Sequence, residues 1–178
     1  MAAALFVRRL EDDEEALAEP VSVASAGLLP GGYASPAEVV SVMAELDIDL
    51  ADHRSTEVSA ELVEDADVVL GLGRRHAREV VLLEPAAWDR TFTLKEFVRR
   101  GEDAGPRGAD EPLPAWLARM HRNRQRSALV GTSPEDDVSD PLGGPLAAYR
   151  ATARELGDLV DRVAGLLCVP RPTGTRQG

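Results

Sequence analysis

The stretch DVVLGLGRRHAREVVLLEPAAWDRTFTL (residues 67–94) decides the fold class of this 178-residue chain. Residues 67–73 form a nearly continuous apolar run that ends in glycine, which is typical of a strand buried on both faces. The residues that follow predict a helix stopped by Pro85, and residues 90–94 predict a second short strand. A strand, a helix and a strand in this order predict two parallel strands joined by a crossover.

The preceding residues extend this α/β pattern. Residues 21–27 alternate in polarity and are rich in valine, so they predict a third strand that ends in a glycine turn. Residues 35–46 predict a helix with Ser35 as N-cap, Pro36 as first helical residue and Glu38 completing a capping box.

Five further segments have helical spacing or helix-end signals. They are residues 1–18, residues 59–66 with Ser59 as N-cap, residues 95–101 with Gly101 as stop, residues 113–130, and residues 145–167. The whole pattern predicts a single α/β domain with a parallel sheet.

Composition restricts the class of protein. Apolar residues make up 44% of the chain, which favours a folded core, and the net charge of −11 argues against nucleic-acid binding. Cys168 stands alone, which excludes a disulfide framework, and its apolar neighbours predict a packing residue. No segment has the length of a membrane span or the charge order of a signal peptide, so we expect a cytoplasmic protein.

The segment DDVSDPLGGP (residues 136–145) holds the first candidate catalytic residue. Pro141 keeps the preceding Asp140 out of the helical region, and the two glycines allow close approach of the backbone. A carboxyl group held on such a loop can act as a general acid. The alternative is a solvated Asp-Pro turn.

The three histidines lie too far apart in sequence for a metal motif, and no phosphate-binding glycine motif is present, so we expect no metal and no cofactor. His53 is interpreted as a structural residue or a catalyst, and His76 as a surface residue. His121 lies in a basic segment that predicts a solvated helix face, or a docking surface for an acidic or phosphorylated partner. The arginines of this basic segment are Arg119, Arg122, Arg124 and Arg126.

Five segments in a fixed order resemble the low-molecular-weight protein tyrosine phosphatase family. They are MAAALFVRRL (1–10), VSVASAG (21–27), VMAELDIDLADHRS (42–55), EDADVVLGLGRRH (64–76) and DVSDPLGGPLAAY (137–149). The resemblance implies a flavodoxin-like three-layer fold with four parallel strands in the order 2-1-3-4. No segment resembles the family's first, central strand or its Cys-x5-Arg phosphate loop, which precede a helix similar to residues 1–10. We therefore expect one domain over residues 1–170 without that strand, an insertion at 98–135, and a disordered tail at 171–178.

The resemblance also implies a chemistry. In the family, the loop cysteine forms a phosphocysteine and the loop arginine holds the phosphoryl oxygens. Asp140 then corresponds to the general acid, Pro141 sets its loop geometry, and Ser25 and His53 match residues that support the phosphate loop. The implied substrate is a phosphotyrosine protein or a small aryl phosphate. Leu142 replaces the aromatic residue found at this position in many relatives.

Three interpretations of the missing loop remain open. One is a reading frame begun too late, so that the parent is an active phosphatase; loss of a central strand would otherwise leave a gap of about 10 Å and unpaired buried backbone groups. A second is a pseudophosphatase that acts as a binding module. The third is an arsenate reductase, which needs more cysteines than Cys168.

Overall fold

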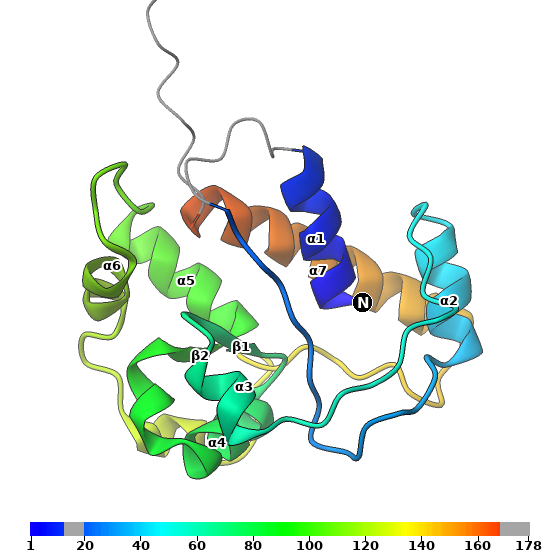
Figure 1. Ribbon diagram of the computed structural model, residues 1–178, viewed down its shortest axis with the longest axis horizontal. Helices are drawn as coiled ribbons and strands as arrows, with labels where there is room; N and C mark the ends of the chain where they lie inside the picture. Colours follow the sequence, from blue (N-terminus) through cyan, green and yellow to red (C-terminus); the bar gives the residue numbers. More distant parts are fainter. Residues whose placement is uncertain (13–19, 168–178) are drawn as a thin grey trace, which may run out of the picture.

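The computed structural model describes residues 1–12 and 20–167, so Cys168 and residues 171–178 lie outside the described residues. Seven α-helices lie within this part of the chain: α1 (Ala2–Asp12), α2 (Ala37–Ala44), α3 (Ala60–Glu64), α4 (Arg74–Leu83), α5 (Leu94–Ala104), α6 (Leu113–Met120) and α7 (Leu146–Leu167). Two strands, β1 (Val69–Gly71) and β2 (Thr91–Thr93), and two 3-10 helices, η2 (Pro85–Arg90) and η3 (Arg126–Leu129), complete the described structure (Figure 1).

The strand–helix–strand prediction for residues 67–94 is confirmed. β1 and β2 are parallel, with Leu70 opposite Phe92, and α4 and η2 form the crossover between them. All of β2 is buried, but Val69 and Leu70 of β1 are only half-buried. The expectation that the first strand is buried on both faces is therefore wrong for these two residues. Within the described residues, β1 has a strand neighbour on one side only.

The predicted strand at residues 21–27 is not formed. Gly27 makes a single parallel bridge with Glu57, through bonds of 2.8 Å from the Gly27 N–H to Thr56 O and 2.9 Å from the Val58 N–H to Gly27 O. Residues 20–26 run as an unpaired trace in Figure 1, and Val21 is 38% exposed. A strand needs a neighbour for its N–H and C=O groups, and the described structure offers none to these residues.

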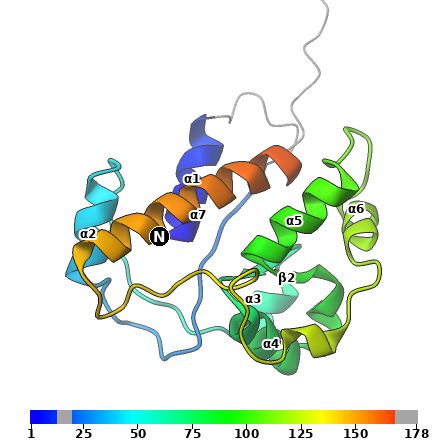
Figure 2. The same ribbon diagram turned by 180° about the vertical axis from the view of Figure 1, so that it is seen from behind.

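The core lies where α5, α6 and α7 meet the sheet. Phe97 contacts both Phe92 and Trp116 edge to face, with ring centroids 5.5 and 5.6 Å apart. Leu156 and Val163 of α7 close this cluster. The helix predicted over residues 145–167 is confirmed as α7, which also packs on α1 and α2, as seen from behind in Figure 2.

Two predicted helix ends are wrong. Pro36, not Ser35, is the N-cap of α2, with φ −53° and ψ 146°, and no side chain caps this helix. Ser35 is thus one residue too far from the first turn for its hydroxyl to serve. Gly101 does not stop α5 but lies buried inside it, and the helix ends at Gly105, where φ is +78°.

The other helix predictions have mixed outcomes. Ser59 caps α3 as expected, accepting a 3.2 Å bond from the N–H of Leu62. The helix predicted over residues 113–130 is broken, because α6 ends at Met120 and Asn123 adopts a φ of 62°. Of the helix predicted over residues 1–18, the described part is α1.

Candidate functional site

Asp140 lies on an exposed loop between η3 and α7, which we call the Asp140 loop (residues 131–145). Its Oδ1 accepts a 3.0 Å hydrogen bond from the N–H of Leu142, which makes an Asx turn over Pro141. The carbonyl of Pro141 accepts a 2.8 Å bond from the Gly144 N–H. The local conformation is therefore the Asp-Pro turn expected from the sequence, and it presents the carboxyl group to solvent.

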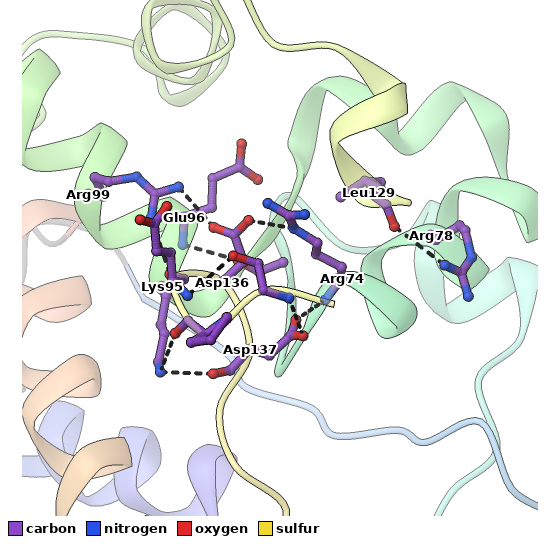
Figure 3. A network of polar contacts seen from close by, with 12 residues as sticks. Arg74, Arg78, Lys95, Glu96, Arg99, Leu129, Asp136 and Asp137 are labelled. Carbon is purple, nitrogen blue, oxygen red and sulfur yellow. Dashed lines mark hydrogen bonds and ion pairs between the residues drawn. The ribbon is translucent and has the colours of Figure 1, made fainter. Parts of the chain in front are cut away.

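Asp137 joins this loop to the start of α4. Its Oδ1 accepts a 2.7 Å bond from the N–H of Arg74, and its Oδ2 accepts a 2.9 Å bond from the N–H of Ser133 (Figure 3). The next residue, Val138, donates its N–H to the carbonyl of Leu72 at 2.8 Å. The loop thus runs along the carboxyl end of β1.

Asp136 is buried between two arginines. Its carboxylate binds Nε of Arg74 at 2.7 Å and Nη2 of Arg99 at 2.9 Å (Figure 3). Burial raises the pKa of the Asp136 carboxyl, but hydrogen bonds from Arg99 and Arg74 outweigh burial and hold this pKa below its usual value. Asp136 is therefore ionised at neutral pH, with both oxygens engaged, and is unsuited to donate a proton.

Contacts with α5 and α7 hold the rest of the loop. Nζ of Lys95 donates to the carbonyls of Pro134 and Asp137 at 3.2 and 2.8 Å and pairs with Glu155 at 2.6 Å. Immediately before Asp140, the carbonyl of Ser139 accepts a 3.3 Å bond from the hydroxyl of Thr152. Lys95 is the only lysine of the chain.

The charge of Asp140 acts on the pKa of one histidine, His76. It lies in the first turn of α4 and is exposed, as expected. The surrounding protein atoms keep part of the solvent from the imidazole and thereby lower the pKa of His76, neighbouring Arg75 lowers it further, and the charges of Asp140 and Asp137 act in the opposite direction. This electrostatic link could not be predicted from the sequence, because His76 and Asp140 belong to segments far apart along the chain.

The structure does not bring Ser25 or His53 to Asp140. Ser25 lies exposed in the unpaired trace, and His53 is exposed in a turn where its N–H bonds the carbonyl of Leu50 at 3.2 Å. Among the described residues, no hydrogen bond or ion pair joins either side chain to Asp140. The resemblance implies that both residues support a phosphate loop, and the sequence contains no such Cys-x5-Arg loop.

The basic segment is not a solvated helix face. The Arg124 side chain is 2% exposed and lies between the rings of Trp88 and Phe92, 4.1 and 4.0 Å from their centroids. Arg119 pairs with Glu111 at 2.9 Å. The Arg124 side chain is thus used inside the protein, which removes it from any docking surface, whereas Arg119 remains 35% exposed while it pairs with Glu111. The sequence did not show this, because the aromatic partners come from other elements.

A surface hollow of about 710 Å³ adjoins this segment rather than Asp140. It is lined by residues of α6, η2 and the chain after α3, among them Asp89, His121 and Arg122. Within residues 1–12 and 20–167, no group of three or more His, Cys, Asp or Glu residues could hold a metal ion. None of the described helices is both long and apolar enough to cross a membrane.

Comparison with known proteins identifies the family. Residues 1–115 match the family described as low molecular weight phosphotyrosine protein phosphatase. The chain is 32% identical over 145 residues to a protein-arginine-phosphatase of Geobacillus stearothermophilus, a match that covers 81% of this chain and 75% of the relative. The chain therefore belongs to the low molecular weight phosphotyrosine protein phosphatase family.

Solved structures show the same fold. A low molecular weight protein tyrosine phosphatase from T. tengcongensis superposes with a TM-score of 0.65 at 28% identity, over 91% of this chain and 86% of that one. The YwlE arginine phosphatase from Geobacillus stearothermophilus gives 0.63 at 29% identity, over 92% and 80%. The flavodoxin-like α/β fold class expected from the sequence is thus confirmed.

Proposed function

We propose that this chain supplies the acid–base residue of a phosphomonoester hydrolase that works through a phosphocysteine intermediate, and that Asp140 is that residue. The observation that supports the proposal is the exposed Asp140 carboxyl group, on a loop that polar contacts attach to α4, α5 and α7. The sequence contains no Cys-x5-Arg motif, so the nucleophile is not among these 178 residues.

The proposed reaction has two steps. A cysteine thiolate attacks phosphorus, the bond from phosphorus to the leaving oxygen breaks, and Asp140 gives its proton to that oxygen. The Asp140 carboxylate then takes a proton from water as the water oxygen attacks phosphorus and the S–P bond breaks. Ser25 and His53 support the phosphate loop, and Pro141 keeps Asp140 in its turn.

The proposed substrate is a phosphorylated protein side chain or a small aryl phosphate. Phosphotyrosine follows from the family, and phosphoarginine is a second candidate because relatives covering 81% of the chain are protein-arginine-phosphatases. With phosphoarginine the bond that breaks joins phosphorus to a guanidinium nitrogen, and Asp140 gives its proton to that nitrogen instead of to an oxygen. Leu142, which is 70% exposed beside Asp140, offers an aliphatic contact rather than an aromatic one. A cytoplasmic location suits this chemistry, because thiols stay reduced there.

A pseudophosphatase that binds phosphoproteins is the alternative function. The observation in its favour is the lack of a Cys-x5-Arg motif in the sequence. Arsenate reduction is the weaker alternative, because a redox relay needs further cysteines besides Cys168.

The test uses a chain extended at its N-terminus by a strand and a Cys-x5-Arg loop. Asp140→Asn in this chain should lower kcat by about 10²–10⁴ for phenyl phosphate, the scale of a lost general acid. The loss should shrink for p-nitrophenyl phosphate, whose leaving group hardly needs a proton, and KM should change little. Equal losses for both substrates, or none, would show that Asp140 is not the acid.

A phosphoarginine peptide and a phosphotyrosine peptide, compared in the same chain, decide between the two substrate classes. Ser25→Ala and His53→Ala are the comparison variants for Asp140→Asn, assayed on phenyl phosphate and p-nitrophenyl phosphate. We expect both to lower activity without any dependence on the leaving group. If the extended chain hydrolyses neither peptide but still binds phosphopeptides, the pseudophosphatase alternative replaces the enzyme.

A further inference from the structure

We infer that Asp137 is the positioning residue that sets where Asp140 stands relative to α4 and the end of β1. The inference rests on the proposed function of Asp140 as general acid. Asp137 itself touches no reacting group in this scheme. It acts through the backbone that leads to Asp140.

Asp137 uses both of its carboxylate oxygens to bind backbone N–H groups. One binds the N–H of Arg74, the first residue of α4, at 2.7 Å, and the other binds the N–H of Ser133 at 2.9 Å. The first N–H groups of a helix lack partners within the helix, and a negative charge there is favourable. Asp137 therefore caps α4 from a segment remote in sequence.

Gly73 leaves room for this contact. As N-cap of α4 it has no side chain to bind the first N–H groups, and a Cβ built on it would lie 2.8 Å from Oδ1 of Asp137. Its φ of −175° is extended backbone that any residue adopts. The glycine is thus required for space rather than for conformation.

The connection from Asp137 to Asp140 is short. Only Val138 and Ser139 intervene, and both are fixed through the backbone. Val138 donates to Leu72 O at 2.8 Å, and the carbonyl of Ser139 accepts from Thr152 at 3.3 Å. A displacement of Asp137 therefore displaces Asp140 as well, because the two residues between them are held in place by their own hydrogen bonds.

Asp136 and Asp137 hold the loop through different kinds of partner. Asp136 binds the side chains of Arg74 and Arg99, which are long and have many rotamers. Asp137 binds backbone N–H groups, so it fixes the loop to the helix itself. In Figure 3 both carboxylates belong to one network, Asp136 on the side chain of Arg74 and Asp137 on its backbone N–H.

The first experiment measures amide hydrogen exchange in the 178-residue chain. Asp137→Ala should speed exchange at Arg74, Ser133, Val138 and Leu142 by about tenfold or more, as expected when a local opening becomes easier. Glu135→Ala is the matched control, because it removes a carboxylate from the same loop whose oxygens bind no other described residue. Unchanged exchange in Asp137→Ala would overturn the inference.

Gly73→Ala disturbs the contact between Asp137 and the start of α4 from the side of the helix. Its new methyl group must displace the Asp137 carboxylate, while both bonded residues stay chemically intact. We expect faster exchange at the same amides, and this variant keeps the test valid if Asp137→Ala does not fold. Protection equal to that of the unmodified chain would contradict the inference.

The second experiment measures kinetics in the chain extended by a Cys-x5-Arg loop. Asp137→Ala and Gly73→Ala should lower kcat for phenyl phosphate by about 10-fold or more, and less for p-nitrophenyl phosphate, with KM nearly unchanged. A purely structural role would lower both equally. If Asp140→Asn shows leaving-group dependence and these variants do not, the positioning role is wrong and the proposed function stands. If Asp140→Asn shows none, the proposed function fails first.

Discussion

Arg124 binds Glu96 through two hydrogen bonds, from Nε to Oε1 at 2.7 Å and from Nη2 to Oε2 at 2.9 Å, in the interior of the protein. Arg124 also donates to the carbonyls of Trp88 and Thr91. The segment after α6 is thereby fastened to β2 and to the first turn of α5. Arg124, which belongs to a stretch predicted to be a solvated helix, thus holds the segment after α6 to the sheet.

Arg124→Ala should destabilise the chain by about 2–4 kcal/mol, because the buried Glu96 carboxylate then keeps only Arg100, at 2.9 Å, and the carbonyls of Trp88 and Thr91 lose their donor. Urea unfolding followed by circular dichroism measures this change. Arg126→Ala removes a neighbouring exposed arginine, whose guanidinium lies 5.8 Å from the Trp88 ring, and should cost less than about 1 kcal/mol. Similar losses in both variants would contradict the assigned role of Arg124.

Gly101→Ala should also destabilise the chain, by about 1–3 kcal/mol, because the added Cβ would lie 2.8 Å from Cδ1 of Leu166 on α7. Gly157 is the matched control, since it is also inside a helix but has nothing within 4 Å of an added Cβ. Gly157→Ala should raise stability by about 0.5–1 kcal/mol through helix propensity. In thermal melts we expect a lower Tm for Gly101→Ala and a higher Tm for Gly157→Ala.

Stability should fall as the pH drops below about 6.5, the usual pKa of histidine, in part because of His121. Its Nε2 is buried without a hydrogen-bond partner among the described residues, and its ring lies edge-on to Trp88. Burial lowers the pKa of His121, and Arg124 and Arg100 lower it further, against Asp89 and Glu96. As the pH falls below the usual pKa of histidine, the unfolded chain therefore binds a proton at His121 before the folded chain does, and this favours unfolding.

Urea unfolding at pH 7.5 and pH 5.5, on the chain and on His121→Gln, measures this contribution. Part of the loss should remain in the variant, because the pKa of His76 is lowered as well. An identical loss in both proteins would rule out His121 as a contributor.

The purified 178-residue chain should not hydrolyse p-nitrophenyl phosphate, since no cysteine stands in a Cys-x5-Arg motif. A continuous absorbance assay, with the extended chain as positive control, checks this. Activity that disappears in Cys168→Ser would show that Cys168 is a nucleophile and not the packing residue expected from its apolar neighbours.

Local signals determined the parts of the fold that form within a few residues. The apolar run of β1, the stop at Pro85 and the cap at Ser59 all predicted their elements. The Asp-Pro turn was equally clear, because Pro141 restricts Asp140 directly. In each case the deciding interaction joins neighbours in the sequence.

Tertiary contacts decided the rest. Residues 21–27 have the composition of a strand but find no adjacent strand in the described structure, so they pair only at Gly27. Gly101 looked like a helix stop, yet it lies buried inside α5, where an added Cβ would meet Leu166 of α7. The family and the Asp140 loop could be predicted from the sequence, but the attachment of that loop through Asp137 to Arg74 could not. The physical reason is that a hydrogen bond between distant segments leaves no periodicity or spacing in the sequence, and only the folded backbone brings its donor and acceptor together.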